Sequence, residues 1–397
     1  MDGTRFSPLT DHAQGSQPAT AGQTAPNPRA TTALALYFSR LGAPMYVHER
    51  VTLFAVAESI ARLTGYRNAG VFDANEPSPG HVFFVPDDTL MLGEARELGI
   101  HSPCQLYGAV VPYPFAKTKA ITHQLINTHA TRPHGWSTVF AQNVSNVVLP
   151  GYTAFNIDDA RAAAMRLLPL GALRAKEPLG DGGHGQAVIN TITELDVFLE
   201  NLPTEKITRH GLVLEANLRR ATTRTVGYTM IGDRSIAYHG TQRSVINNHG
   251  VSVYGGSHLI CVRGAWTELE RLPMDAEARL AVTQARTYDR NANEYPGFLA
   301  SCRNYDVGQG VDAHGQWRSG VFEASWRSGG ASTAELAALT AFAADSSLRV
   351  VDANSVKHFG KPRKPPPGAA VHFCGNDPED GPLMRYTVIT RALRHAG

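Results

Sequence analysis

A lysine stands directly before a glycine-rich loop in the stretch AKEPLGDGGHGQAVI, which runs from Ala175 to Ile189. Glycine loses more chain entropy on folding than any other residue, so a cluster of glycines often marks a place where a ligand approaches the backbone. Phosphate is the commonest ligand of this kind, because backbone N–H groups bind it well. Lys176 and the loop therefore predict a nucleotide-phosphate site, with a surface hairpin that binds nothing as the alternative.

Two familiar phosphate-binding motifs do not fit this loop. In the P-loop the lysine follows the glycines, whereas Lys176 precedes them. Gly180, Gly182 and Gly185 match the letters of the dinucleotide fingerprint, but that motif opens a helix directly after its last glycine. The apolar residues that follow here, 186–189, predict a strand instead. We therefore expect a hairpin, in which two strands flank the glycine loop and fold over a nucleotide.

Two carboxylates, Asp306 and Glu323, lie in two predicted strands on either side of a turn at Gly315. If these strands pair, both side chains project toward one point, where mutual repulsion and loss of hydration are unfavourable. Mg²⁺ bound to nucleotide phosphates removes both problems, because it favours one or two carboxylates together with phosphate oxygens. Arg327 faces the same side as Glu323 if the strand continues, and it could then hold an anionic substrate group. The alternative is a set of charges on solvated strand edges.

Composition narrows the class of protein. A chain of 397 residues is long enough for two or three domains, and a net charge of +2 gives no general attraction to nucleic acid or anionic membranes. No apolar run approaches the ~20 residues that cross a bilayer, and the N-terminus shows no secretory signal. The four cysteines are far apart, which is typical of reduced thiols. We expect a cytoplasmic protein with neither a nucleic-acid nor a membrane partner.

The N-terminal part of the chain has two regions. Residues 1–30 are rich in small and polar residues and predict a disordered tail. Beyond them, ALALYFSRLG (33–42) and LFAVAESIARLTGY (53–66) have helix-like apolar spacing. The stretches HVFFVP and QLYGAVVPYP predict strands, with a helix at TLMLGEARELGI between them. This alternation predicts a small α/β domain with a parallel sheet over residues 31–114.

The rest of the chain mixes both kinds of element. FAKTKAITHQLINTH (115–129) predicts a helix with two lysines near its start, and KHFGKPRKPPPG (357–368) predicts a basic, proline-rich loop. Further helices are predicted at IDDARAAAMRLLPLG, DAEARLAVTQARTYDRNANEY and TAELAALTAFAADS, and strands at LRAKEP, GLVLEANL, RTVGYTMIG, RSIAYHG and SHLICVRGAWTEL. We expect one domain over 115–356, with a glycine-loop lid at about 150–215, and a C-terminal strand and helix segment over 357–397.

In this order, the lysines, the glycine hairpin, a glutamate-bearing strand and the carboxylate pair resemble the ATP-grasp superfamily, over about Phe115 to Asn354. The stretches VPDDTL, VPYPFAKTKAITH, KEPLGDGGHGQ and SWRSGGAS are similar to an uncharacterised bacterial family of that group, known only as a domain of unknown function. The resemblance implies an α/β ATP-grasp fold preceded by a pre-ATP-grasp α/β domain. It also implies ATP and Mg²⁺ as cofactors.

The resemblance implies a role for each motif residue. Arg327 and Lys176 would be catalytic, and Lys119, rather than Lys117, would be the first phosphate lysine. The glycine loop would close over the triphosphate, and Glu215 would lie at the hinge beside adenine. The nucleotide would contact Lys119, Lys176, Gly180, Gly182, Gly183, His184, Gly185, Glu215 and Leu218, and the metal would contact Asp306, Glu323 and Ser325.

Two positions depart from the family pattern. The pattern E-x-N-x-R has an asparagine as a metal ligand where this chain has Ser325. Serine is a shorter and weaker ligand, so we expect one magnesium to be lost or held more loosely. Thr222 stands where some members have the glutamate that binds the ribose, which leaves the ribose contact open.

The resemblance predicts a ligase that phosphorylates a small-molecule carboxylate with ATP and passes the acylphosphate to an amine or another nucleophile. A kinase-like phosphotransferase, motivated by Ser325, and a catalytically degenerate nucleotide-binding module, motivated by Ser325 and Thr222, are the alternatives. We expect the substrate between the N-terminal domain and the glycine-loop domain. A homodimer is left open.

Overall fold

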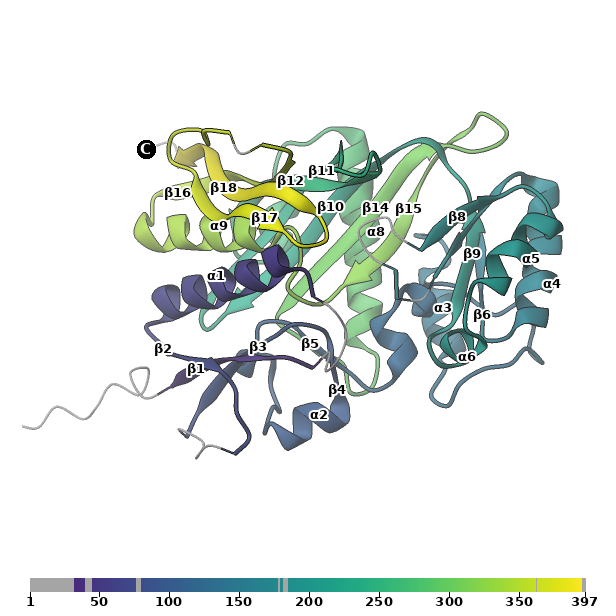
Figure 1. The fold of residues 1–397 in the computed structure, drawn as a ribbon, viewed down its shortest axis with the longest axis horizontal. Coiled ribbons are helices and arrows are strands. Elements are labelled where there is room, and N and C mark those ends of the chain that lie inside the picture. Colours follow the sequence, from purple (N-terminus) through teal and green to yellow (C-terminus); the bar gives the residue numbers. More distant parts are fainter. Residues whose placement is uncertain are drawn as a thin grey trace, which may run out of the picture.

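The computed structural model describes residues 32–39, 45–75, 80–177, 179–180, 185–361 and 363–394. The predicted disordered tail and the loop residues Gly182, Gly183 and His184 lie outside this range. Helices and strands are mixed along the chain, which confirms the expected α/β class. Figure 1 shows a large central sheet, with a smaller sheet at one end and the N-terminal strands and α1 below it.

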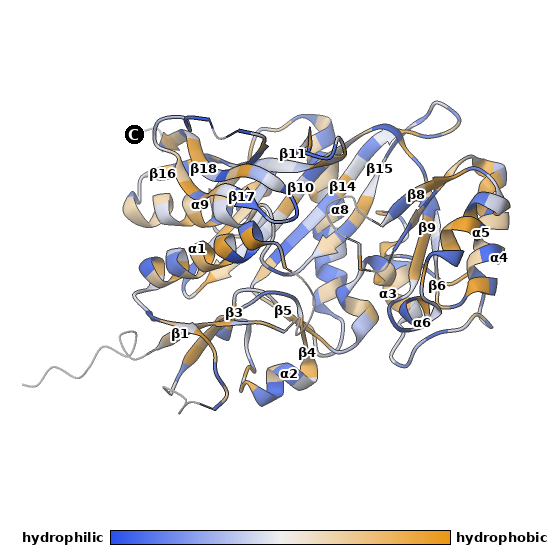
Figure 2. Ribbon diagram, viewed as in Figure 1, coloured by the Kyte–Doolittle hydropathy of each residue, from blue (hydrophilic) through white to orange (hydrophobic). Residues whose placement is uncertain are grey.

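The N-terminal strands form a parallel sheet, as predicted. Its order is β2-β1-β3, with β1 (Ala33–Tyr37) pairing parallel to β2 (Arg67–Val71) and β3 (Val82–Pro86). Helix α1 (Val47–Thr64) packs on it and ends at Gly65, whose φ of 76° suits a glycine. Figure 2 shows the mixed hydropathy of α1, whose hydrophobic residues share a core with the sheet.

The helix predicted at residues 33–42 is wrong, because Ala33–Tyr37 is the central strand β1. Ala33, Leu34, Ala35 and Leu36 are all buried, so both faces of this strand lie in the core. A short continuous apolar run does not distinguish a buried strand from a buried helix by its spacing. Pairing with the neighbouring strands β2 and β3 determines that this segment is a strand.

Several short helices and strands follow β3 along the chain. Helix α2 (Leu92–Glu97) follows β4 (Leu90–Met91), and a second three-stranded sheet has the order β13-β5-β4. It joins β5 (Ala109–Val111) to β13 (Leu299–Ala300), which is distant in sequence. The short helix η2 spans Pro103–Gln105.

The segment 115–129, predicted as one helix, instead forms two short 3₁₀ helices, η3 (Pro114–Lys117) and η4 (Lys119–Thr122). Between them, Thr118 has extended backbone angles, and its hydroxyl accepts from the N–H of Ala120. Threonine side chains that bond to the local backbone compete in this way with a continuous α-helix.

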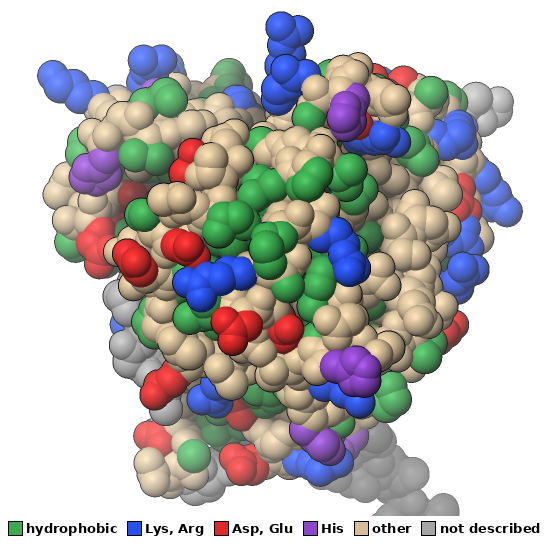
Figure 3. Space-filling model, turned by 90° about the vertical axis from the view of Figure 1, so that its right-hand side faces the viewer, with side chains coloured by type: hydrophobic (Ala, Val, Ile, Leu, Met, Phe, Trp, Pro, Cys, Tyr) green, Lys and Arg blue, Asp and Glu red, His purple; other side chains and the backbone are tan. Residues whose placement is uncertain are grey.

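The small sheet at one end is antiparallel, with the order β6-β9-β7-β8. Its strands β7 (Leu173–Lys176) and β8 (Gln186–Ile189) form the hairpin predicted around the glycine loop. Helices α4 and α5 pack on the sheet, and their outer surface presents both charged and hydrophobic side chains (Figure 3). The other elements are α3 (Thr138–Val144), β6 (Gly151–Ala154), α4 (Ile157–Leu167), η5 (Leu168–Leu170), α5 (Ile192–Glu200), α6 (Thr204–His210) and β9 (Leu212–Ala216).

The large sheet has eight antiparallel strands in the order β15-β14-β10-β11-β12-β16-β18-β17. Helix α8 (Ala276–Asn293) packs on one face and α9 (Ser332–Ala344) on the other, and α7 spans Trp266–Glu270. The strands are β10 (Arg219–Ile231), β11 (Arg234–Ile246), β12 (Ser252–Arg263), β14 (Cys302–Val311), β15 (Trp317–Ser325), β16 (Leu348–Phe359), β17 (Ala370–Asp377) and β18 (Gly381–Arg394).

The C-terminal part of the chain differs from its prediction. Lys357 lies in strand β16 and not in a loop, so the expected boundary at residue 357 falls inside a strand. The final segment also contains no helix between residues 370 and 394, because β17 and β18 complete the large sheet. Among the described residues, no helix is both long enough and apolar enough to span a membrane.

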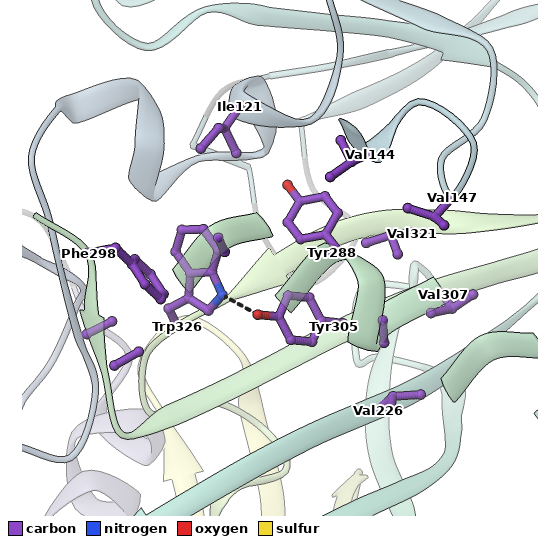
Figure 4. Packing of buried hydrophobic residues seen from close by; sticks show 14 of the residues in the cluster. Ile121, Val144, Val147, Val226, Tyr288, Phe298, Tyr305, Val307, Val321 and Trp326 are labelled. Carbon is purple, nitrogen blue, oxygen red and sulfur yellow. Dashed lines mark hydrogen bonds between the residues drawn. The ribbon is translucent and has the colours of Figure 1, made fainter. Parts of the chain in front are cut away.

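The alternation of side chains along β14 separates the core from a polar face. Tyr305 and Val307 pack in the core beneath α8 with Tyr288, and the indole N–H of Trp326 donates to the Tyr305 hydroxyl at 3.2 Å (Figure 4). Successive side chains of a strand point to opposite faces, so Asp306 lies on the face that α9 partly covers.

Candidate active site

The strands β14 and β15 place the two predicted carboxylates side by side. They are antiparallel around the turn at Gly315, as expected from the sequence, and Asp306 lies directly opposite Glu323. Directly opposed residues of an antiparallel pair have Cβ atoms about 5 Å apart on one face. The two carboxylates therefore share a small region at the edge of the large sheet.

A bulge in β15 directs two consecutive side chains toward this region. Asp306 pairs with Glu323 but Val307 pairs with Val321, so Phe322 is the additional residue. Its ring lies over Gly308, where an added Cβ would stand only 1.8 Å from the ring. Bulges often re-aim side chains next to functional sites. Here the bulge and the glycine allow Phe322 and Glu323 to reach the same site.

Asp306 is held by two amide donors. Its Oδ1 accepts from Gln242 Nε2 at 2.7 Å and from Asn304 Nδ2 at 2.9 Å. Burial, and then the charge of Glu323, raise the pKa of Asp306 to about 6. The site therefore disfavours two negative charges and favours a positive charge beside them.

Lys119 supplies one such charge. Its side chain, in η4, is 3% exposed, and its Nζ lies 3.0 Å from Oε2 of Glu323. The same ammonium donates to the carbonyl oxygen of Gly180 in the glycine hairpin. Lys119 thus links the large sheet to the hairpin of the small sheet.

Lys176 lies at the end of β7, on the other side of the same region. Its Nζ is 4.5 Å from the centre of the Phe322 ring and 2.5 Å from Oε1 of Glu215. Burial lowers the pKa of Lys176, and Glu215 acts against that change. The phenyl ring of Phe322 contributes a cation–π contact.

Glu215 lies in β9, is buried, and also contacts a histidine. Its Oε2 lies 3.1 Å from Nε2 of His123. Burial alone would raise the pKa of Glu215, but Lys176 and His123 hold it below its usual value. Gly151 lies opposite Glu215, and an added Cβ there would stand 2.8 Å from the His123 ring. His123 and Gly151 also line a cavity of about 70 Å³.

A backbone hydrogen bond continues the β7–β8 pairing into the described part of the glycine hairpin. The N–H of Glu177 donates to the carbonyl of Gly185 at 2.7 Å. Gly185 has a φ of 66°, in the left-handed region that favours glycine. Leu218, which was expected to contact the nucleotide, is buried just beyond β9.

Ser325 is the last residue of strand β15, whereas Arg327 lies beyond its end. Arg327 lies 3.6 Å from the Asp88 carboxylate. Lys117 contacts the same carboxylate at 3.2 Å. Lys117 and Lys119 therefore have different partners, because Lys119 contacts Glu323. Ser325 lies opposite Asn304, whose amide binds Asp306.

Several residues of this region were not predicted from the sequence. Asn304 could have been found, because it lies two residues before Asp306 and so shares its face in a strand. Gln242, His123 and Asp88 had no such signal, because each reaches the site through contact with a distant segment. Phe322 is next to Glu323, but only the bulge in β15 directs its ring to the site.

Solved structures of ligases and carboxylases resemble the chain at low identity. N5-carboxyaminoimidazole synthase from Aspergillus clavatus, in complex with ADP and 5-aminoimidazole ribonucleotide, is 11% identical with a TM-score of 0.49, covering 91% of this chain and 94% of that chain. Phosphoribosylamine–glycine ligase from Thermotoga maritima is 11% identical with a TM-score of 0.48, covering 89% and 91%. Biotin carboxylase from Campylobacter jejuni is 10% identical with a TM-score of 0.47, covering 91% and 87%. Identity this low carries no statement on activity or substrate.

Among curated proteins, no sequence matches the chain. A family model does match it, over residues 40–387, which is most of its length. The chain therefore belongs to the family described as "Protein of unknown function (DUF3182)".

Proposed function

We propose that the protein is an ATP- and Mg²⁺-dependent ligase of the ATP-grasp type. It would activate a small-molecule carboxylate as an acylphosphate, which an amine or another nucleophile then attacks. The observation that carries this proposal is the opposed pair Asp306 and Glu323, with the ammonium of Lys119 on Glu323. Carboxylates and lysines at one point are what a magnesium-bound triphosphate requires.

The carboxylate pair fits Mg²⁺ better than a metal held by protein alone. Within the described ranges, no cluster of three or more His, Cys, Asp or Glu side chains could hold a metal ion. Mg²⁺ commonly takes one or two carboxylates and completes its shell with phosphate oxygens and water. Asp306 and Glu323 would hold it, with Ser325 as a weaker third ligand. Its contribution when bound is to neutralise charge on the phosphates.

The two lysines would hold the phosphates. Phosphoryl transfer depends mainly on positioning and charge neutralisation. Lys119 and Lys176 approach the site from opposite sides, and each now pairs with a carboxylate, Glu323 and Glu215 respectively. A hydrogen bond between a charged lysine and a phosphate contributes roughly 1.5–3 kcal/mol. Each lysine would exchange part of its carboxylate contact for a phosphate oxygen.

The lid, about residues 150–215, would close over the triphosphate. Gly180 and Gly185 flank the loop of the β7–β8 hairpin, and Lys119 already connects Gly180 to the large sheet. Closing a site in this way excludes water that would hydrolyse an acylphosphate. Glu215 and Leu218 would border the adenine, and Arg327 would hold the anionic substrate.

Calorimetric titration with Mg²⁺ and ATP tests the nucleotide site. Lys176→Ala is expected to weaken ATP binding about tenfold or more, since it removes a charged contact to phosphate. Arg174→Ala is the matched control, because Arg174 lies on the same strand but bonds to Asn217 and Gln186. Equal ATP affinity in the wild type and in Lys176→Ala would refute the assignment.

Product analysis by mass spectrometry tests the reaction type. ADP with an amide or similar condensation product supports the ligase. ADP with a phosphorylated product that persists supports a kinase-like phosphotransferase. ATP that binds without being consumed, across a panel of carboxylates and amines, supports a degenerate binding module.

A further inference from the structure

A second polar pocket lies on the same face of the large sheet, away from Lys119 and Lys176. It is a small pocket, partly open to solvent, between the start of α9, strands β12 and β16, and the β17–β18 hairpin. No acidic side chain lines it within the described part of the chain, whereas hydroxyl and basic groups do. The polar side chains that line it include Arg385, Lys357, His372, Tyr254, Thr333 and Ser355.

Arg385 is the cation of this pocket without a carboxylate partner among the described residues. Its Nη1 donates to Nδ1 of His48 at 3.3 Å, and His48 uses its other ring nitrogen for Asp380 at 2.9 Å. Burial, and then Lys357 and Arg385, lower the pKa of His48 to about 4, so the ring is neutral near pH 7. A neutral imidazole accepts a hydrogen bond but leaves the charge of Arg385 uncompensated.

Among the described residues, the acidic groups near Arg385 either bind other side chains or have no hydrogen bond to Arg385. Asp380 binds Nζ of Lys357 at 2.8 Å as well as His48. Glu49 acts on Arg385 only through its charge. A partly buried arginine in these surroundings favours a bound anion, because burying an unpaired charge is costly.

The start of α9 forms one wall of the pocket. No side chain caps this helix, and Gly330 and Thr333 line the pocket beside its first turn. The positive end of the helix dipole favours a negative charge near this wall. Gly330 allows the Tyr254 ring to approach, since an added Cβ would stand 2.3 Å from that ring. The Tyr254 hydroxyl lies 2.7 Å from Oγ of Ser257 and 3.3 Å from Oγ of Ser355.

Strand pairing connects this pocket to the carboxylate pair. Ser257 pairs with Gln242 of the neighbouring strand, and Gln242 donates directly to Asp306. Neighbouring strands lie about 4.8 Å apart, so the two sites share one continuous polar face.

We infer that the Arg385 pocket binds an anionic oxygen group of the substrate, a phosphate or a carboxylate, remote from the group that reacts at Asp306 and Glu323. The substrate class is then a carboxylate that carries a second anionic group. The identification of this ligand as the substrate rests on the proposed ligase function. The anion pocket itself does not.

Calorimetric titrations with inorganic phosphate and with succinate test the pocket. Arg385→Ala is expected to weaken binding of at least one of these anions about tenfold or more, because it removes a charged, bidentate donor. Arg391→Ala is the matched control, an exposed arginine of the same strand that binds Asp352. Arg391→Ala should change the affinity for either anion by no more than about twofold relative to the wild type. Arg385→Lys keeps the charge and serves if the alanine variant does not fold, and it should retain part of the affinity.

The two anions and a parallel ATP titration separate the outcomes. Phosphate bound through Arg385 assigns a phosphorylated substrate, and succinate bound through Arg385 assigns a dicarboxylate. Anion binding that is equal in Arg385→Ala and the wild type would overturn the inference, even if ATP binds normally. Arg385-dependent anion binding without any ATP binding would instead overturn the proposed ligase and leave the anion pocket standing.

Discussion

At the scale of single residues, the pair Asp306 and Glu323 destabilises the folded protein when no cation is bound. The folded-state pKa of Asp306 is raised from 3.8 to about 6, chiefly by burial and by Glu323. The folded protein therefore binds this proton more tightly than the unfolded chain. The resulting loss of stability is fully present above about pH 6 and disappears as the pH falls through about 6 toward 3.8.

Asp306→Asn is expected to stabilise the protein at neutral pH without Mg²⁺. Both donors to Asp306 bind Oδ1, which asparagine retains. We expect the free energy of unfolding to rise by about 1–2 kcal/mol at about pH 7.5, and the gain to shrink at about pH 4.5. Urea unfolding at both pH values measures it.

Asp312→Asn is the matched control for this pH effect. The hydrogen bond from Arg318, with further bonds from the backbone, lowers the pKa of Asp312. Its stabilisation is therefore present at neutral pH and is lost as the pH falls, so the control should be less stable than the wild type at neutral pH. Stabilisation by both substitutions, or by neither, would contradict the assignment of the raised pKa to Asp306.

The buried pair Lys176 and Glu215 should behave as a unit. Lys176→Met or Glu215→Gln alone leaves a charge without its partner, and each is expected to lower the free energy of unfolding by about 3 kcal/mol. The double variant should lose clearly less than the sum, since no unpaired charge remains. A double-mutant cycle by urea unfolding measures the coupling, and strict additivity would contradict it.

At the scale of elements, the β15 bulge depends on a glycine in the neighbouring strand. An alanine at position 308 would collide with the Phe322 ring. Gly308→Ala is expected to lower stability by about 1–3 kcal/mol and to weaken binding of Mg²⁺ and ATP, because it displaces the strand that carries Glu323. Unfolding and calorimetric titration measure the two effects.

Two variants control this prediction. Gly93→Ala places its Cβ in open space within helix α2 and should be neutral or slightly stabilising. Phe322→Leu added to Gly308→Ala should restore part of the stability, because the smaller side chain makes room for the new methyl group. Failure of that rescue would show that the clash with Phe322 is not the cause.

At the scale of the whole molecule, one buried carboxylate joins separate regions. Glu335 of α9 accepts hydrogen bonds from Tyr107 before β5, from Thr229 of β10 and from Tyr238 of β11. The Tyr238 hydroxyl also lies 3.2 Å from Oδ1 of Asn304, whose amide donates to Asp306. The N-terminal region, the large sheet and the carboxylate pair are thus connected through one network.

Glu335→Ala is expected to lower the free energy of unfolding by about 3 kcal/mol or more, because it leaves three buried hydroxyl groups without their acceptor. Tyr107→Phe removes one of these bonds and should cost about 1 kcal/mol. Tyr152→Phe is its control, since the Tyr152 hydroxyl has no hydrogen bond within the described chain. Equal stability of the Tyr107 and Tyr152 variants would contradict the role of the network.

The sequence by itself determined the elements whose signals are local. Asp158 and Asp159 at the start of α4, the glycines around Gly185 and the turn at Gly315 act within a few residues, and those elements were predicted correctly. The opposed placement of Asp306 and Glu323 followed from that turn, because a hairpin fixes its own register.

Only the tertiary structure decided which distant residues meet. The apolar run at 33–37 became a strand because parallel neighbours cover both of its edges. The contact of Lys119 with Glu323, and the uncompensated charge of Arg385, depend on segments far apart in the chain. Such contacts have no local signature, since a side chain's periodicity records which face it occupies but not which partner the fold brings to it.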